Sequence, residues 1–276
     1  MKVTLITVCF NSAATLSTAI DSVLSQKGVD VEYIIVDGGS KDGTVDIIKE
    51  YADKTLNSQL LTPNFTFRWL SESDRGMYDA INKGIKMATG DVVGILNADD
   101  VLASDDTLAH IVSAFNTDSC ALTPDPSRVD AVYADIRFVK EGETVAALRE
   151  AKTVRYCSAK RWRPWMFRFA AMVPHPSFYV RRECFEKLGG YSLDYRICAD
   201  FELELRYLYL AKLKTAYLPE CVVVMRMGGM STAGWRSNIV INREDLRALR
   251  AHGIWSCLPL IYLKYLFKIW GFVFRR

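Results

Sequence analysis

The sequence predicts an α/β fold, with a mostly parallel mixed sheet flanked by helices, and three observations support this prediction. Short unbroken apolar runs alternate with amphipathic helical patterns through the first 100 residues. Such runs are typical of strands buried on both faces of a parallel sheet. The chain has 276 residues, of which half are apolar, and it carries no low-complexity tract or repeat. This length suffices for one large or two small domains.

The first half of the chain alternates strand and helix. We expect helices at about 13–25, from about residue 44, and at about 77–88. Strands are expected at 3–8, 31–36, 65–70 and 92–96. The polar segments after parallel strands gather at the carboxyl edge of the sheet, where open α/β sheets bind ligands.

The second half follows a less regular pattern. Helices are expected at about 105–116, 181–188 and 199–211. Residues 153–174 are expected to form a loop rich in arginine and aromatic residues. The remaining expected elements are strands at 131–135, 177–180 and 221–227, a hairpin around 141–143, and a basic helical tail at 236–276.

Charge is distributed unevenly along the chain. The net charge is +3, but residues 153–182 contribute +7 and residues 236–276 contribute +6, which leaves −10 for the rest. The basic regions favour an anionic partner. Seven cysteines without a C-x-x-C pair favour a reducing cytoplasm over a disulfide framework or zinc knuckle. The apolar run at 3–8 is too short for a signal peptide.

Acidic residues follow three of the predicted strands. Asp37 ends the second strand, Asp74 lies just after the third, and Asn97-Ala98-Asp99-Asp100 follows the fourth. Mg²⁺ and Mn²⁺ prefer oxygen ligands, often one or two carboxylates together with substrate phosphates. Taken singly, each acid fits a turn or a helix cap equally well. Together they predict one crevice that binds a ligand and a divalent cation.

An ordered set of motifs resembles the family 2 glycosyltransferases of bacterial surface polysaccharide biosynthesis. The resemblance covers about residues 1–235, and both order and spacing agree. The motifs are TVCFN at 7–11, DGGSKDGT at 37–44, DRGMYDAINKG at 74–84, ATGD at 88–91, NADD at 97–100, HPSF at 175–178, KLGGY at 187–191, ADFEL at 199–203 and MGGMS at 227–231.

The resemblance implies a GT-A fold and an inverting transfer from a UDP-sugar. A nucleotide-binding half at about 1–104 and an acceptor-binding half at about 105–235 would precede the tail at 236–276. It implies hydrogen bonds from Asp37 and Asp74 to the uracil. Thr7 and Asn11 would line the nucleoside pocket, and Ser40 belongs to the same donor-binding set.

The resemblance also implies roles in catalysis. Asp99 would bind Mg²⁺ or Mn²⁺ at the diphosphate, with Asp100 beside it, and Asp200 matches the general base. This chain has Asn97 where a two-aspartate element would begin, so Asp99 becomes the principal ligand. Independently of the resemblance, a diphosphate leaving group needs charge neutralisation and an acceptor hydroxyl needs a base. The alternative for Asp200 is an acid favoured by the helix dipole.

Two further residues have open roles. His175 could contact a phosphate or the acceptor, or it could be a structural histidine. Arg75 could reach the diphosphate, or it could be a surface arginine.

Two basic, aromatic-rich regions bear on partners. Residues 160–169 fit a loop that touches an anionic lipid-linked acceptor; a solvated loop is the alternative, and no nucleic-acid module accompanies it. Residues 254–274 are mainly apolar but contain Lys264 and Lys268. Two central lysines argue against a transmembrane helix and favour a helix in the membrane interface. The alternative is a terminal helix docked on the catalytic domain or on a second protomer of a homodimer.

These observations predict a cytoplasmic enzyme, peripheral on the inner face of the plasma membrane. It would transfer one sugar from a UDP-sugar to a polyprenyl-diphosphate-linked glycan. The alternative is a catalytically inactive nucleotide-sugar-binding scaffold of a membrane glycan-assembly complex. A nucleotidyltransferase or dehydrogenase is disfavoured, because 7–13 lacks glycine and 38–43 does not fit G-x-G-x-x-G.

Overall fold

The strand and helix alternation of the N-terminal half is confirmed in the computed structural model, which describes residues 1–57, 64–116, 128–140, 142–228 and 235–265. The elements are β1 (Lys2–Cys9), α1 (Leu16–Leu24), β2 (Asp30–Asp37), α2 (Thr44–Asn57), β3 (Phe65–Ser71), α3 (Met77–Met87) and β4 (Val92–Ile95). β3, β2, β1 and β4 lie side by side in this order, and all three pairings are parallel.

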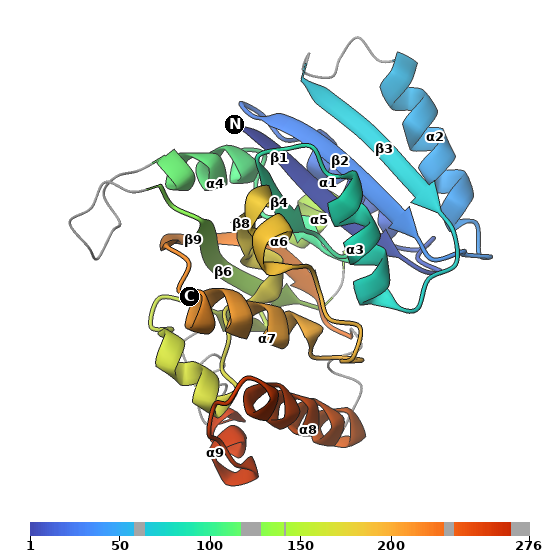
Figure 1. Cartoon of the computed structure of the whole chain (residues 1–276). Helices are drawn as coiled ribbons and strands as arrows, with labels where there is room; N and C mark the ends of the chain where they lie inside the picture. Colours follow the sequence, from blue (N-terminus) through green and yellow to red (C-terminus); the bar gives the residue numbers. More distant parts are fainter. Residues whose placement is uncertain (58–63, 117–127, 141, 229–234, 266–276) are drawn as a thin grey trace.

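Alternating side chains of these strands pack into two buried clusters, one on each face of the sheet. Ile6 of β1 packs with Ile81 of α3 on one face, whereas Leu5 packs with Ile20 of α1 on the other. The approach of α3 is close, since a Cβ on Gly84 would lie 2.6 Å from the Ile6 side chain. Figure 1 shows α3 in front of these strands and α2 beyond β3. The carboxyl ends of β1, β2 and β4 therefore meet at one edge of the sheet.

The C-terminal half completes a mixed sheet and surrounds it with short helices. Its elements are β5 (Val101–Leu102), α4 (Thr107–Asn116), β6 (Ala131–Val139), α5 (Val145–Glu150), β7 (Arg155–Cys157), the 3₁₀ helices η2 (Pro164–Phe169) and η3 (His175–Ser177), β8 (Tyr179–Arg181), α6 (Arg182–Leu188), α7 (Ala199–Glu204), the π-helical turn η4 (Leu205–Leu210), β9 (Thr215–Arg226), α8 (Trp235–Ala251) and α9 (Leu258–Tyr262). Over the described residues the strand order is β3-β2-β1-β4-β8-β6-β9-β5, with β7 on β6. Among the described residues of this half, only the β6–β9 ladder is parallel.

The predicted hairpin around 141–143 is wrong. β6 and β7 do pair antiparallel, but α5 lies between them. Thr144 caps α5 by accepting a hydrogen bond from Ala147 N at 3.1 Å, and Leu148 is fully buried beside Val139. Residue 141 lies outside the described part of the chain, as do Cys120 and most of the 227–231 motif.

The predicted loop at 153–174 also needs correction, because it contains β7 and η2. Trp162 and Phe167 are buried and meet edge to face, with ring centroids 5.3 Å apart. Apolar packing therefore orders part of a segment whose charges alone suggested an exposed loop.

The described part of the tail packs on the rest of the protein. Leu249 of α8 and Ile261 of α9 belong to the same buried cluster as Ile81 and Phe201. Lys264 is buried and donates to Asp245 at 2.6 Å. Residues 235–265 therefore agree with the alternative of a helix docked on the catalytic domain, because Lys264 has a buried partner and α9 ends at Tyr262. Lys268 lies outside the described residues. Across the five described ranges, no helix is both long and apolar enough to cross a bilayer.

Candidate functional site

Asp37 organises the loop at the end of β2. Its buried carboxylate accepts hydrogen bonds from Gly39 N and Ser40 N, both at 3.0 Å, and from Ser71 Oγ at 2.7 Å. Ser40 Oγ also donates to it. Burial raises the pKa of Asp37, but the hydrogen bonds from Ser40, Ser71 and Gly39 outweigh it and lower the pKa. The loop is therefore held in shape by an ionised carboxylate.

Asp74 lies directly over this loop. A Cβ on Gly38 would lie 2.5 Å from Asp74 Oδ2, so a residue without a side chain allows the approach. Asp74 Oδ1 accepts from Gly76 N at 2.8 Å, just before α3 begins. The structure thus brings Asp37 and Asp74 together, as expected from their places after β2 and β3.

Asn11 joins the end of β1 to the same loop. Its backbone is left-handed, with φ of 51°, and its N–H donates to Ser40 Oγ at 2.7 Å. Asn11 Oδ1 accepts from Lys41 N at 3.0 Å. Thr7 is different, since its buried hydroxyl accepts from Tyr33 at 2.9 Å, and Tyr33 packs with the α1 side of the sheet.

The Asn97–Asp100 turn follows β4 at the same edge. Asn97 Nδ2 donates to Asp100 Oδ2 at 2.8 Å, and Asp100 is fully buried. Asp100 Oδ1 has no hydrogen-bond partner. Burial, followed by the charge of Asp99, raises the pKa of Asp100 well above its ordinary value. Asp99 is partly exposed.

Arg226, at the end of β9, is hydrogen-bonded to the main chain of this turn. Its Nη1 donates to the Asp99 carbonyl at 2.8 Å, and its Nη2 donates to Thr18 Oγ1 at 3.0 Å and Gly142 O at 2.9 Å. The guanidinium binds main-chain oxygen of Asp99 and so leaves that carboxylate available for another ligand.

The turn has the donor chemistry of a hard divalent cation site. Two adjacent carboxylates are present, one with an unpartnered buried oxygen, and a substrate diphosphate can supply further oxygens. Within the described ranges no three His, Cys, Asp or Glu side chains gather into a protein-only metal site. The residues therefore fit a cation that is shared with a phosphate ligand.

Asp200 begins α7 and is tied to the element that follows Asp74. Its Oδ1 accepts from Phe201 N at 2.8 Å and lies 3.1 Å from the hydroxyl of Tyr78, in the first turn of α3. The loop before Asp200 is held by Glu244 of α8. The Glu244 carboxylate accepts from the N–H groups of residues 196, 197 and 198 at 3.1, 2.9 and 3.0 Å. The tail thus helps to position Asp200.

His175 bonds to a tyrosine beside Asp200. His175 Nε2 lies 2.7 Å from the hydroxyl of Tyr191, whose ring stacks on Tyr78 with centroids 5.6 Å apart. Burial lowers the pKa of His175, which favours the neutral imidazole. These contacts agree with the structural alternative for His175.

Glu204 lies one turn after Asp200 and is fully buried. Its Oε2 accepts from Val173 N at 3.1 Å, and its Oε1 has no hydrogen-bond partner. Burial, followed by the charge of Asp200, raises the pKa of Glu204 well above its ordinary value. The direction of this shift favours the neutral acid in the folded protein.

We expect Glu204→Gln to stabilise the protein increasingly as pH rises. In wild type, the unfolded chain releases this proton above about pH 4.3, which costs stability up to the higher folded pKa. The variant cannot titrate at this position. The difference in melting temperature between variant and wild type should therefore be about 2–4 °C larger at pH 8 than at pH 5. Thermal unfolding at both pH values measures this gain.

Glu202→Gln is the matched control on the same helix. Although burial raises the pKa of Glu202, its ion pair with Arg206 lowers the value, so this substitution should destabilise the protein at pH 8. A Glu204→Gln variant that behaved like Glu202→Gln would show that Glu204 is ionised in the folded state.

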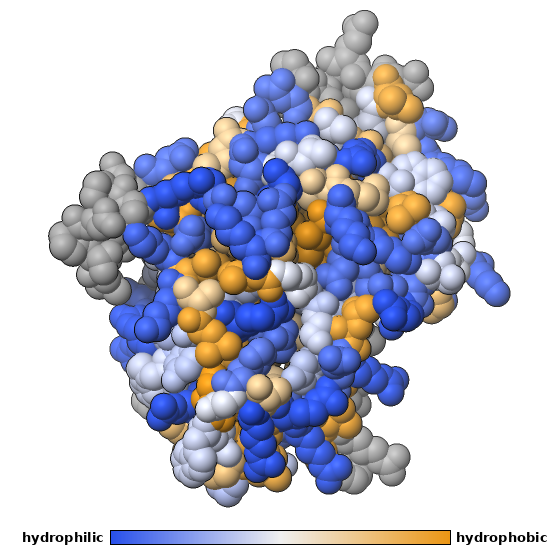
Figure 2. All heavy atoms as spheres, viewed as in Figure 1, coloured by the Kyte–Doolittle hydropathy of each residue, from blue (hydrophilic) through white to orange (hydrophobic). Residues whose placement is uncertain are grey.

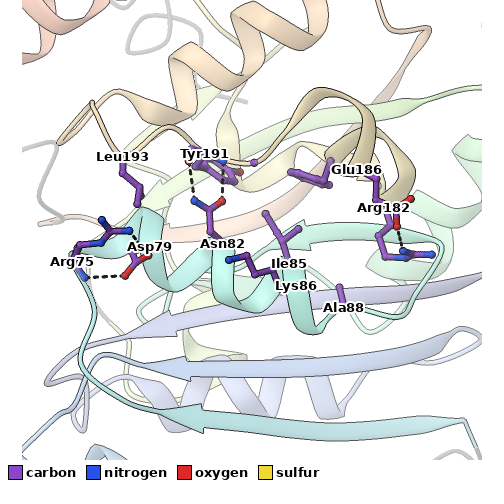
Figure 3. Close-up of a pocket in the computed structure, with 12 residues that line it drawn as sticks. Arg75, Asp79, Asn82, Ile85, Lys86, Ala88, Arg182, Glu186, Tyr191 and Leu193 are labelled. Carbon is purple, nitrogen blue, oxygen red and sulfur yellow. Dashed lines mark hydrogen bonds and ion pairs between the residues drawn. The ribbon is translucent and has the colours of Figure 1, made fainter.

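A separate cavity of about 520 Å³ lies along the outer side of α3, against α6 and residues 189–193. Of the predicted site residues it contains only Arg75, which pairs with Asp79 at 3.6 Å and has a 76 % exposed side chain. Figure 3 shows this pair at one end and the Arg182–Glu186 pair at the other, with Asn82 bonded to Tyr191 between them. Internal pairs occupy most of its polar groups.

Comparison with known proteins gives the family. The family model described as "Glycosyl transferase family 2" matches residues 4–189, about two thirds of the chain. The chain belongs to glycosyl transferase family 2.

Curated relatives of this glycosyltransferase come from several bacteria. It is 31% identical over 239 residues to the "PGL/p-HBAD biosynthesis glycosyltransferase" of Mycobacterium tuberculosis, covering 87% of this chain and 80% of that protein. It is 29% identical to an uncharacterised glycosyltransferase of Nostoc, covering 83% of this chain and 66% of that one.

Solved structures of glycosyltransferases share its GT-A fold. S. aureus TarS 1–349 in complex with UDP-GlcNAc superposes with a TM-score of 0.62 at 16% identity, over 90% of this chain and 66% of that one. In another TarS 1–349 structure the match spans 65% of that chain. The mannosyltransferase PcManGT from Pyrobaculum calidifontis, in complex with GDP-Man and Mn²⁺, has a TM-score of 0.63 at 22% identity, over 98% and 72%.

Several residues of the glycosyltransferase site have no role in the sequence prediction. Tyr78 and Tyr191 lie inside the recognised motifs, so their positions were marked although their contacts were not. Arg226 and Glu244 carry no local signal, because their partners lie about 127 and 46–48 residues away in the sequence.

Proposed function

We propose that this glycosyltransferase transfers a sugar from a UDP-sugar to a hydroxyl of a lipid-linked glycan, with inversion at the anomeric carbon. The observation that supports it best is the position of the Asp200 carboxylate. It accepts a hydrogen bond from Phe201 N and lies beside the hydroxyl of Tyr78, which is on α3, the helix that follows Asp74. One carboxylate oxygen is engaged there, which leaves Oδ2 to receive a proton.

In the proposed step, Asp200 takes the proton of the acceptor hydroxyl. The oxygen forms a bond to the anomeric carbon from the face opposite UDP, and the bond between that carbon and the diphosphate oxygen breaks. UDP leaves with the bonding electron pair, so a single displacement inverts the configuration. Asp99 and Asp100 would hold Mg²⁺ or Mn²⁺, which supplies positive charge to the departing diphosphate.

The donor pocket is proposed at the edge formed by β1, β2 and β4. Asp37 and Asp74 would meet the uracil, and the Asp37 loop would present the main chain of 38–40 to the ligand. The proposed donor set is Asn11, Asp37, Ser40, Asp74, Asn97 and Asp99. The sequence prediction also included Thr7, Arg75 and His175, which contact Tyr33, Asp79 and Tyr191 in this structure. The TarS complex with UDP-GlcNAc and the PcManGT complex with GDP-Man and Mn²⁺ support a nucleotide-sugar donor and a metal.

The acceptor and location are part of the same proposal. A polyprenyl-diphosphate-linked glycan would place the protein on the cytoplasmic face of a membrane, and the relative that acts in PGL/p-HBAD biosynthesis supports a glycan-assembly role. A homodimer remains a prediction.

Calorimetry of nucleotide binding tests the donor. With Mn²⁺ present, UDP should bind at least about ten-fold more tightly than GDP, since the proposal assigns Asp37 and Asp74 to a uracil base. Tighter binding of GDP would overturn the UDP assignment. A chain that binds UDP but releases none from any UDP-sugar, with or without glycan acceptors, would support the inactive scaffold instead.

A further inference from the structure

Two elements far apart in sequence form one exposed surface. η2 and α9 pack together, and Ser256 Oγ, just before α9, donates to Arg168 O at the end of η2 at 2.7 Å. Trp255 is 71 % exposed and Trp165 is 56 % exposed. We call this the aromatic–basic surface; it consists of Trp165, Trp255, Leu258, Tyr262 and Leu263, with the exposed cations Lys160, Arg161, Arg163 and Arg168.

The exposed aromatic residues are not part of an incompletely filled core. On the same segment Trp162 is 6 % exposed and Phe167 is fully buried, and Phe167 meets Phe201 of α7 with centroids 5.6 Å apart. One set of rings therefore attaches η2 to the protein while Trp165 points outward. In Figure 2 the lower end of the molecule shows pale and orange side chains between strongly hydrophilic ones.

The charge of this surface has one sign. Neither 153–182 nor 246–265 contains a single Asp or Glu. The cations are Lys and Arg, and Lys264 does not contribute to this surface because it is turned inward, to Asp245. An all-cationic surface with exposed indole and leucine side chains complements a partner that is anionic and also offers an apolar layer.

We infer that the aromatic–basic surface docks on an anionic lipid bilayer. Trp and Tyr prefer the membrane interface, where their rings contact acyl chains and their polar atoms meet headgroups, while Lys and Arg bind the lipid phosphates. Nucleic acid would leave Leu258 and Leu263 unmatched. The contact uses two short helices that lie against the protein, rather than one continuous amphipathic helix.

The position of this surface gives the docked enzyme an orientation. Phe201 follows Asp200 directly, so the ring that anchors η2 to the core touches the helix of the proposed base. A glycan carried on a bilayer lipid would then reach the site from the η2 side. This orientation rests on the proposed function, whereas bilayer binding does not.

Vesicle co-sedimentation of the full chain tests the inference. We expect binding to vesicles of phosphatidylcholine with phosphatidylglycerol, weak binding to phosphatidylcholine alone, and loss of binding in high salt. Arg161→Glu with Arg163→Glu should weaken binding at least about thirty-fold, because each basic residue near an anionic surface contributes roughly five-fold. Trp165→Ser with Trp255→Ser should weaken it about ten-fold.

Matched controls lie on α2, at the other end of the molecule. Lys49→Glu with Lys54→Glu changes the net charge equally, and Leu56→Ser removes a side chain that is 84 % exposed. Neither should weaken binding. UDP binding measured on every variant reports folding and donor binding independently of the bilayer.

Three results would overturn the inference. The first is no binding of wild type to anionic vesicles, and the second is equal weakening by the α2 controls. The third is a dimer of wild type that Trp165→Ser with Trp255→Ser converts to a monomer, which would assign the surface to a second copy. If vesicle binding behaves as expected but no UDP-sugar is used, the lipid surface stands and the proposed function fails.

Discussion

Asp200→Asn is expected to lower kcat at least about a thousand-fold while leaving UDP binding unchanged. The amide cannot take a proton from the acceptor hydroxyl, and a positioned base contributes about 10²–10⁴-fold. In wild type, Asp200 Oδ1 accepts a hydrogen bond from Phe201 N at 2.8 Å. The amide oxygen of Asn can accept the same hydrogen bond, so the start of α7 should keep its geometry. Turnover with donor and acceptor, together with calorimetry of UDP, separates the two effects.

Tyr78→Phe is the control for the Asp200 prediction. It removes the hydroxyl that lies 3.1 Å from Asp200 Oδ1 but keeps the ring that stacks on Tyr191. We expect a loss of about ten-fold or less in kcat. Near-wild-type activity of Asp200→Asn would remove Asp200 from the role of base, and equal losses in both variants would assign it to positioning.

Asp99→Asn is expected to abolish the contribution of Mn²⁺ to UDP binding and to lower kcat/KM by about 10²–10³-fold. Asp99 is the partly exposed carboxylate of the turn, and its main chain is held by Arg226, so the amide should keep the fold. Without the charge, the hard cation loses a principal ligand and the diphosphate leaves without neutralisation. Titration of UDP with and without Mn²⁺ measures the first effect.

Asp106→Asn provides the control for the Asp99 prediction, because Asp106 is an exposed acid just before α4, outside the turn. It should leave the metal dependence unchanged. Retention of Mn²⁺-dependent binding in Asp99→Asn would instead assign the cation to Asp100, whose Oδ1 is buried without a partner.

The sequence predicted the N-terminal half of the fold well, for a physical reason. β1, β2 and β4 are mainly apolar and almost wholly buried because both faces are covered, and such segments are visible without tertiary information. β3 is partly exposed and contains polar residues. The convergence of Asp37 and Asp74 followed from the rule that parallel strands end at one edge.

The second half was harder to predict because tertiary contacts decide it. The two residues of β5 form a strand only because β9 lies beside them, and α5 replaces a hairpin because Leu148 fills a small buried cluster. Lys264 has the charge of a surface residue, and only the folded chain supplies Asp245. In the candidate site, Asp99 was marked by its residue type and its place after a strand, and Asp200 by the family resemblance, whereas Arg226 and Glu244 depend on long-range packing.

Glu244 makes α8 a structural part of the region that holds Asp200. Without α8, three backbone N–H groups at 196–198 would lose their shared acceptor, and Glu202 would lose its contact with His252. The donor loop around Asp37 makes none of these contacts. A protein shortened at residue 235 would therefore keep the loop around Asp37 but lose the contacts that position Asp200. Such a protein would separate nucleotide binding from the proposed proton transfer.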